Sequence, residues 1–253
     1  MSTPVGIHLG VLSWYVMCLR HGQPPDITFD LARVIVFEMT VASLVYGTDR
    51  GASLRQTVPS GLATVGLLLS EPSTSMLFPI VLLCSTGYKW FKPRLGWTKP
   101  AFVATMWILA CVTVPVAFES HSLFQHVDVW IWGHIWCNLF AISNMLDIPD
   151  IEEDQDTGVR TLAISLGSRN AETVSQAALC ASTLIALQHP SSATLVFSLQ
   201  NTFVQHLIRT GQLHRVIKRN KASFDIRSSH VRRTHVSRFR VLTNRHVSLI
   251  RTL

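Results

Sequence analysis

The amino-acid sequence predicts an all-α, polytopic transmembrane helix bundle of about eight spans around a central chamber. Three observations lead to this fold class. The 253 residues are 48% hydrophobic and only 15% charged, which is too apolar and too poor in charge for a soluble domain of this length. The apolar residues gather in long runs, and short polar segments separate these runs. We therefore expect an integral, multi-pass membrane protein.

The candidate spans are eight apolar runs. Several are shorter than the ~20 residues that cross about 30 Å of hydrocarbon, so we expect their helices to extend into flanking polar residues, or one pair to form a hairpin that does not fully cross. The third and fourth runs are the candidates for such a pair. The runs are Val5–Leu19, Leu31–Gly47, Val58–Ser70, Met76–Tyr88, Ala101–Phe118, Val127–Leu146, Thr173–Leu187 and Ala193–Ile208.

The connections between these runs alternate in charge. Apart from Arg20 and Arg33 at span edges, the odd-numbered connections hold no Lys or Arg. Positively charged connections stay on the cytoplasmic side of a membrane or its organellar equivalent, so the even-numbered connections and both termini are predicted to share that side. The basic residues of the even-numbered connections are Arg50, Arg55, Lys89, Lys92, Arg94, Lys99, Arg160 and Arg169.

The chain divides into a transmembrane domain, residues 1–208, and a basic tail, residues 209–253. The tail holds twelve of the 22 Lys and Arg residues and so accounts for most of the net charge of +7. The charge therefore does not predict a nucleic-acid partner. We interpret the tail as a disordered end, with binding of anionic lipid head groups as the alternative. The five cysteines are scattered in apolar runs without a CxxC pair, which predicts small buried side chains.

An acidic segment directly follows the sixth run. Six of the fifteen acidic residues fall within positions 147–156. On a helix, Asp147, Asp150 and Asp154 lie within an arc of roughly 60°, where they would repel one another unless a cation neutralised them. Hard oxygen ligands suit Mg²⁺, and Pro149 fits only near a helix start. The pattern predicts a magnesium site, with a solvated acidic loop as the alternative.

Basic side chains predicted to lie on the same side of the membrane as this segment suggest a second ligand. Lys92, Arg94 and Arg160 would face the carboxylates across the mouth of the bundle, and cations beside a metal are what a diphosphate requires. Asn144, one turn before Asp147, is expected to orient it and to contact the diphosphate. The apolar bundle would accommodate a lipid tail on the same ligand.

Residues 147–167 resemble the second aspartate-rich motif of the UbiA superfamily of intramembrane prenyltransferases. The segment reads D-x-x-D-x-x-x-D, then G-V-R-T at 158–161, then a closing L-G. A second element, Tyr88-x-x-x-Lys92, resembles the segment after the family's fourth helix. The family's first motif, N-x-x-x-D-x-x-x-D, falls at residues 45–53, where only Asp49 is kept, beside Tyr46 and Arg50.

This resemblance implies a helical bundle with nine spans and Mg²⁺-dependent transfer of a polyprenyl group from its diphosphate to a lipophilic, often aromatic, acceptor. It implies metal ligation by Asp147, Asp150, Asp154 and Asp49. Lys92, Tyr88 and Arg160 would be catalytic, and Lys92, Arg94, Arg160 and Asn144 would bind the diphosphate.

Two other functions stay open. The reduced first motif and the lack of a ninth apolar run favour a prenyl-lipid binding or scaffolding subunit that has lost catalysis. A transporter would place facing ionisable residues at mid-span, and only Glu38 and His134 occupy such positions.

Overall fold

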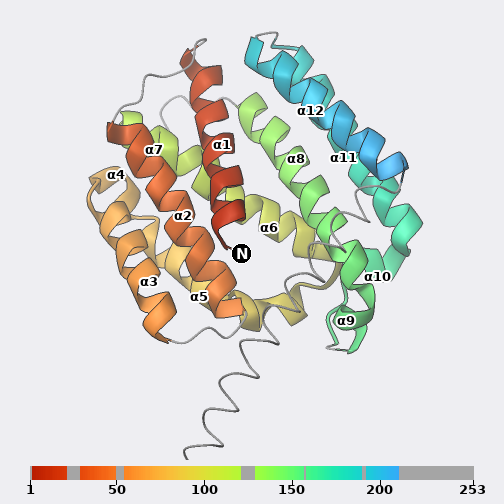
Figure 1. Ribbon diagram of the computed structural model, residues 1–253, viewed down its shortest axis with the longest axis horizontal. Coiled ribbons are helices and arrows are strands. Elements are labelled where there is room, and N and C mark those ends of the chain that lie inside the picture. Colours follow the sequence, from red (N-terminus) through yellow and green to blue (C-terminus); the bar gives the residue numbers. More distant parts are fainter. Residues whose placement is uncertain are drawn as a thin grey trace, which may run out of the picture. The chain divides into compact units, whose positions relative to one another are not determined.

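The computed structural model describes residues 2–21, 29–49, 54–120, 129–156, 158–189 and 192–210. These residues form helices and no strands, so the predicted all-α class is confirmed (Figure 1). The helices are α1 Ser2–His21, α2 Phe29–Asp49, α3 Leu54–Leu69, α4 Pro72–Ser75, α5 Phe78–Leu95, α6 Lys99–Ile108, α7 Val114–Ser120, α8 Val129–Asp147, α9 Ile151–Asp156, α10 Leu162–Leu166, α11 Ser168–Leu187 and α12 Ser192–Arg209.

Each predicted apolar run falls on one long helical segment. The fifth run is built from α6, the π-helical turn Leu109–Thr113 and α7, which follow one another without a break. Two stretches, Leu31–Asp49 and Phe78–Phe118, are long and apolar enough to cross a membrane, and Thr57–Leu69 is a shorter apolar helix. The expected extension into polar residues is seen at α5, which continues to Leu95. The number of spans and the central chamber stay predictions.

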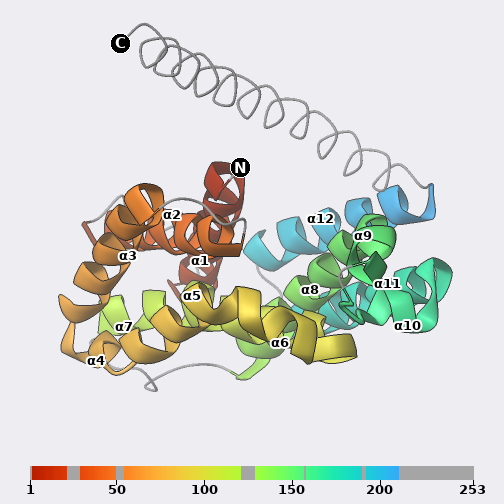
Figure 2. The ribbon, with the colours of Figure 1, turned by 90° about the horizontal axis from the view of Figure 1, so that it is seen from below.

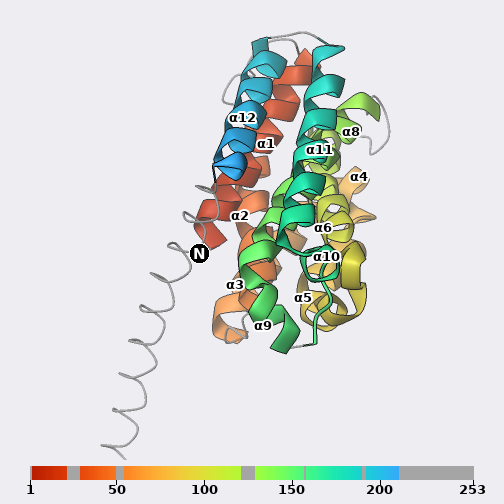
Figure 3. The same cartoon turned by 90° about the vertical axis from the view of Figure 1, so that its right-hand side faces the viewer.

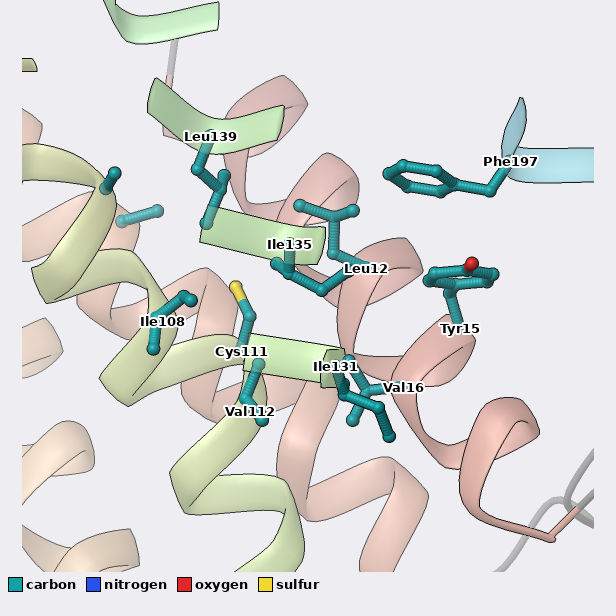
Figure 4. Close-up of a cluster of buried hydrophobic side chains, with 12 residues drawn as sticks. Leu12, Tyr15, Val16, Ile108, Cys111, Val112, Ile131, Ile135, Leu139 and Phe197 are labelled. Atoms are coloured by element: carbon teal, nitrogen blue, oxygen red, sulfur yellow. The ribbon is translucent and has the colours of Figure 1, made fainter. Parts of the chain in front are cut away.

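The body of the protein, residues 1–206, packs around α2 and α8. Helix α2 contacts α1, α3 and α5, whereas α8 contacts α6 and α11. Two clusters of buried apolar side chains result. One joins α1, α6, α8 and α12 and includes Ile108, Ile135 and Phe197 (Figure 4); the other joins α2, α3, α5 and α7 around Phe37.

Large apolar side chains also cover the outer faces of the bundle, where water would make them unfavourable. A lipid environment removes that cost, in agreement with the apolar composition. Those at least 57% exposed on α3, α5, α11 and α12 are Leu62, Leu83, Trp90, Leu184, Leu195, Val196, Leu199 and Phe203.

The helices alternate in direction, and this brings three helix ends together. Helices α2, α5 and α8 all end toward the lower edge of the view in Figure 1, where α9 and α10 also lie, and Figure 3 shows the same grouping from the side. The view from below looks onto these ends (Figure 2). The connection from α5 to α6, the acidic segment and the end of α2 thus share one end of the bundle.

A tight turn joins α5 to α6 at this end. Pro93 lies in the last turn of α5, and Gly96 adopts a positive φ of 56°, a conformation that glycine tolerates without steric cost. The chain then makes a single 3-10 turn, Gly96–Thr98, and α6 begins at Lys99 with Pro100 in its first turn, where a missing amide hydrogen is harmless. This turn fixes the position of the Lys99 side chain.

Candidate functional site

The acidic segment folds as an interrupted helix. Helix α8 ends at Asp147, a 3-10 turn spans Ile148–Asp150 around Pro149, and α9 covers Ile151–Asp156. Gly158 then reverses the chain with a φ of 74°, and its amide donates to the carbonyl of Gln155 at 3.1 Å, as expected after a helix end. Pro149 therefore begins a helical turn, as predicted.

The carboxylates of this interrupted helix differ in burial. Asp147 and Asp154 are 6% and 4% exposed, Asp150 is half-buried, and Glu152 and Asp156 are exposed. Sequence spacing predicts that Asp147, Asp150 and Asp154 share one face, and the structure brings Asp147 and Asp154 into a common contact. That contact is with a lysine.

Lys99 joins the two buried carboxylates. Its Nζ lies 2.6 Å from Oδ1 of Asp147 and 3.7 Å from Oδ2 of Asp154. The three side chains come from α6, α8 and α9, and Lys99 itself is only 6% exposed. Sequence reasoning used Lys99 only as a topology-setting charge. The signal that could have found it is the Lys-Pro pair at the start of a predicted span, since it places the lysine at a helix end.

Tyr88 lies among carboxylates from both aspartate segments. On α5 it is half-buried and lies within electrostatic range of Asp49, Asp147 and Asp154. A hydrogen bond of 2.8 Å from Thr48 Oγ1 to the Ser85 carbonyl ties the end of α2 to α5, and this contact brings Asp49 close to Tyr88. Carboxylates of the first and the second predicted motif thus both lie within electrostatic range of Tyr88.

Lys92, one turn after Tyr88, is half-buried and within electrostatic range of Asp147. Arg94 and Arg160 are exposed. The backbone of Arg160 approaches the turn after α5, because a Cβ built on Gly96 would lie 3.5 Å from the Arg160 carbonyl. Arg50 and Ser53, which sequence analysis placed in the first motif, lie outside the described residues.

Asn144 is held differently from its predicted role. Its amide nitrogen donates to the Ala171 carbonyl at 2.8 Å and to Ser175 Oγ at 2.9 Å, both on α11. These two bonds use both amide hydrogens, which are the atoms that would bind a diphosphate. The oxygen Oδ1 is buried and accepts no hydrogen bond within the described part of the chain. Asn144 therefore fixes α8 to α11, and its remaining atom is an acceptor.

The predicted metal ligands do not form a closed cluster. Among the described residues, no group of three His, Cys, Asp or Glu side chains lies close enough together to hold a metal ion. The donor chemistry nevertheless fits a hard cation: two buried carboxylates adjoin, and Oδ2 of Asp147 accepts no hydrogen bond from any described residue. Lys99 supplies the positive charge in this arrangement.

Glu38 and His134, the ionisable residues inside the predicted spans, are both fully buried. Glu38 accepts a hydrogen bond of 3.0 Å from Ser13. The His134 ring bonds the Tyr15 hydroxyl at 3.0 Å and the Ser182 carbonyl at 2.9 Å. The Glu38 carboxyl group and the His134 ring thus both hydrogen-bond to neutral groups on neighbouring helices. Such hydrogen bonds hold membrane helices together. The paired ionisable groups that a transporter requires are not formed by these two residues.

The chain thus combines helical stretches that are long and apolar enough to cross a membrane with an ionic cluster at the ends of its helices. Residues 56–223 match the UbiA prenyltransferase family. This match covers well over half of the chain, so the protein belongs to that family, and the resemblance of its second motif is confirmed.

Two known proteins are similar to this chain. Homogentisate phytyltransferase 1, chloroplastic, of Arabidopsis thaliana is 29% identical over 106 residues, which are 36% of this chain and 26% of that protein. The match thus spans about a quarter of that relative. The apo structure of a UbiA homolog from Aeropyrum pernix K1 superposes with a TM-score of 0.68 and 13% identity, covering 85% of this chain and 92% of the other. This superposition establishes the UbiA fold.

Proposed function

We propose that the protein is a multi-pass membrane enzyme that transfers a polyprenyl group from its diphosphate to a lipophilic, aromatic acceptor, in a reaction that depends on Mg²⁺. The observation that carries the proposal is the convergence of Asp49, Asp147 and Asp154 around Tyr88, at the end of an apolar bundle, in a UbiA family chain. The name of the plant relative, a homogentisate phytyltransferase, supports an aromatic acceptor.

The carboxylates would hold the metal at the mouth of the bundle. The residues assigned to Mg²⁺ are Asp147, Asp150, Asp154 and Asp49. A bound Mg²⁺ neutralises charge that develops on diphosphate oxygens as a carbon–oxygen bond breaks. Two of these four carboxylates, Asp147 and Asp154, contact the same Lys99 ammonium within 4 Å, which supports the assignment of these two.

Cationic side chains would bind the diphosphate itself. Lys92, on the same helix as Tyr88, lies near Asp147, so an anion held there would meet both a lysine and the metal ligands. The exposed Arg94 and Arg160 would attract the substrate and pair with its outer oxygens, since guanidinium groups bind phosphates through parallel hydrogen bonds. The Tyr88 hydroxyl would donate to the departing diphosphate.

The apolar bundle would hold the prenyl chain and exclude water. An allylic cation reacts with any water that reaches it, so exclusion protects the transfer. Residues 1–208 would form this catalytic domain, although the family match continues to residue 223. The basic tail, 209–253, would lie beside anionic lipids or remain without fixed structure; its residues after Thr210 lie outside the described part of the chain.

A second candidate function rests on the first motif. Val45 occupies the position of the family's asparagine, and it is a half-buried apolar residue on α2. With Asp49 alone, this side of the site would offer one carboxylate where the motif has three polar ligands. The alternative is a binding or scaffolding subunit that holds a prenyl lipid without transferring it.

Consumption of a labelled prenyl diphosphate distinguishes the two functions. Membranes carrying the protein are supplied with radiolabelled farnesyl or geranylgeranyl diphosphate, homogentisate as an aromatic acceptor, and Mg²⁺ or EDTA. We expect Mg²⁺-dependent release of pyrophosphate, reduced about a hundredfold in Asp147→Asn and Asp150→Ala. The control Asp156→Asn changes an exposed carboxylate of the same segment and should keep full activity.

Each outcome decides between the functions. Binding without pyrophosphate release would favour the binding subunit. Unchanged activity in both Asp147→Asn and Asp150→Ala would contradict the assignment of metal binding to this segment.

A further inference from the structure

Lys99 is the one member of the ionic cluster that the proposed reaction does not use. Its side chain is 7% exposed, and those of Asp147 and Asp154 are 8% and 5% exposed. Burial makes charge pairing strong and makes an unpaired charge costly. Lys99 therefore stabilises both buried carboxylates.

The position of Lys99 is unfavourable for a cation without those carboxylates. It is the first residue of α6, and the amino end of a helix carries partial positive charge. Pro100, which follows it, has no amide hydrogen, and so contributes no donor to the acidic cluster. Asp147 and Asp154 thus hold the ammonium where the helix alone would repel it.

One oxygen of this cluster is left for another ligand. Oδ2 of Asp147 is buried and accepts no hydrogen bond from the described residues. The shorter contact, 2.6 Å, occupies Oδ1 of Asp147, whereas the contact with Asp154 is long at 3.7 Å. A divalent cation bound at Oδ2 of Asp147 would therefore compete with the Lys99 ammonium for the same carboxylate.

We propose that Lys99 is an internal counter-ion that competes with the divalent cation for Asp147 and Asp154. This inference rests on the proposed function, because it takes these carboxylates as metal ligands. Without the metal, Lys99 keeps the acidic cluster together and stable. The Lys99 ammonium would leave these carboxylates when a divalent cation binds them. Lys99 is a positioning residue that sets the metal concentration at which the site forms.

Removing the lysine tests the competition directly. The probe is Mn²⁺ or Mg²⁺ alone, without prenyl substrate, and affinity is read from Mn²⁺ electron paramagnetic resonance and from the rise of the melting temperature with metal. We expect Lys99→Met to bind the metal about tenfold more tightly, a difference of about 1.4 kcal/mol, and to melt earlier than the parent in EDTA. The matched control Lys89→Met changes an exposed lysine of α5 and should leave both quantities unchanged.

A second measurement uses the unaltered protein and so does not depend on the folding of a variant. Amine acylation followed by peptide mass spectrometry reports how accessible each lysine is. Lys99 should be protected in EDTA and react several-fold faster in Mg²⁺, whereas Lys89 should react equally in both conditions.

The outcomes separate this inference from the proposed function. Weaker or unchanged metal binding in Lys99→Met would overturn the proposed competition and leave the metal site in place. Equal rates of Lys99 acylation in Mg²⁺ and in EDTA would do the same. Absence of metal binding in the parent, Lys99→Met and Lys89→Met alike would overturn the metal site and, with it, both proposals.

Discussion

Replacing Asn144 by alanine should loosen the contact between α8 and α11 and have little effect on diphosphate binding. The Asn144 side chain is fully buried, and its amide donates to Ala171 at 2.8 Å and Ser175 at 2.9 Å. If these bonds are its function, Ser175→Ala should reproduce part of the effect from the other side of the interface. Ser175 therefore provides the matched variant.

The magnitude follows from the number of bonds lost. Hydrogen bonds between membrane helices contribute about 0.6 kcal/mol on average and up to about 1.7 kcal/mol. Asn144→Ala removes two of them and should lower the free energy of unfolding by about 1–3 kcal/mol. Ser175→Ala removes one acceptor and should lower it by about 0.6–1.7 kcal/mol. Because the two residues share a bond, the double variant should be less destabilised than the sum of the single variants.

Reversible unfolding in mixed detergent micelles, followed by helical circular dichroism, measures these free energies. The KM for the prenyl diphosphate, measured on the same preparations, should differ from the parent by less than about twofold in both single variants. A tenfold or larger increase of KM in Asn144→Ala, with Ser175→Ala unaffected, would refute this reasoning. It would instead support the diphosphate contact that the sequence predicts for Asn144.

Two further predictions concern the helices that carry the site. Gly87→Ala should destabilise the protein by about 1–3 kcal/mol, because the added Cβ would lie 2.8 Å from the Phe91 ring, next to Tyr88 and Lys92. Gly66→Ala, with no atom within 4 Å, should be neutral or stabilise α3 by up to about 1 kcal/mol; equal effects in thermal unfolding would contradict the packing argument. His134→Leu should lower the free energy of unfolding by about 1–3 kcal/mol, because the Tyr15 hydroxyl loses its hydrogen bond of 3.0 Å to the ring. A variant as stable as the parent would show that this contact does not hold α1 to α8.

Much of the fold could be predicted because lipid imposes a simple rule on the chain. Every backbone amide inside a membrane must be bonded within its own segment, so an apolar run of sufficient length becomes a helix. Each of the eight predicted runs lies on a long helical segment, from α1 to α12. Less could be predicted of helix ends. The break between α8 and α9 depends on Pro149, and the continuation of α5 past Tyr88 carries polar residues that a search for apolar runs does not include.

The second aspartate motif was accessible from the sequence because its ligands are close along the chain. Spacing alone indicates that Asp147, Asp150 and Asp154 are near neighbours, and the resemblance of residues 147–167 to a known motif led to the family that the comparison confirms. Topology predicted only that this motif and Asp49 lie on the same side, since both segments follow even-numbered runs. Their roles in metal and diphosphate binding stay predictions.

What the sequence determined by itself is the helical class, the membrane environment and the family, because these depend on local composition and on contiguous motifs. Only the tertiary structure decided which cation meets the acidic segment. Lys99 is 48 residues before Asp147 and has the same charge as Lys89, Lys92 and Arg94, so its charge does not distinguish it from them. The turn at Gly96 and the start of α6 direct its ammonium to the carboxylates. In the same way, the Asn144 amide donates to Ala171 and Ser175 because α8 packs on α11. No feature of Asn144 itself indicates these partners.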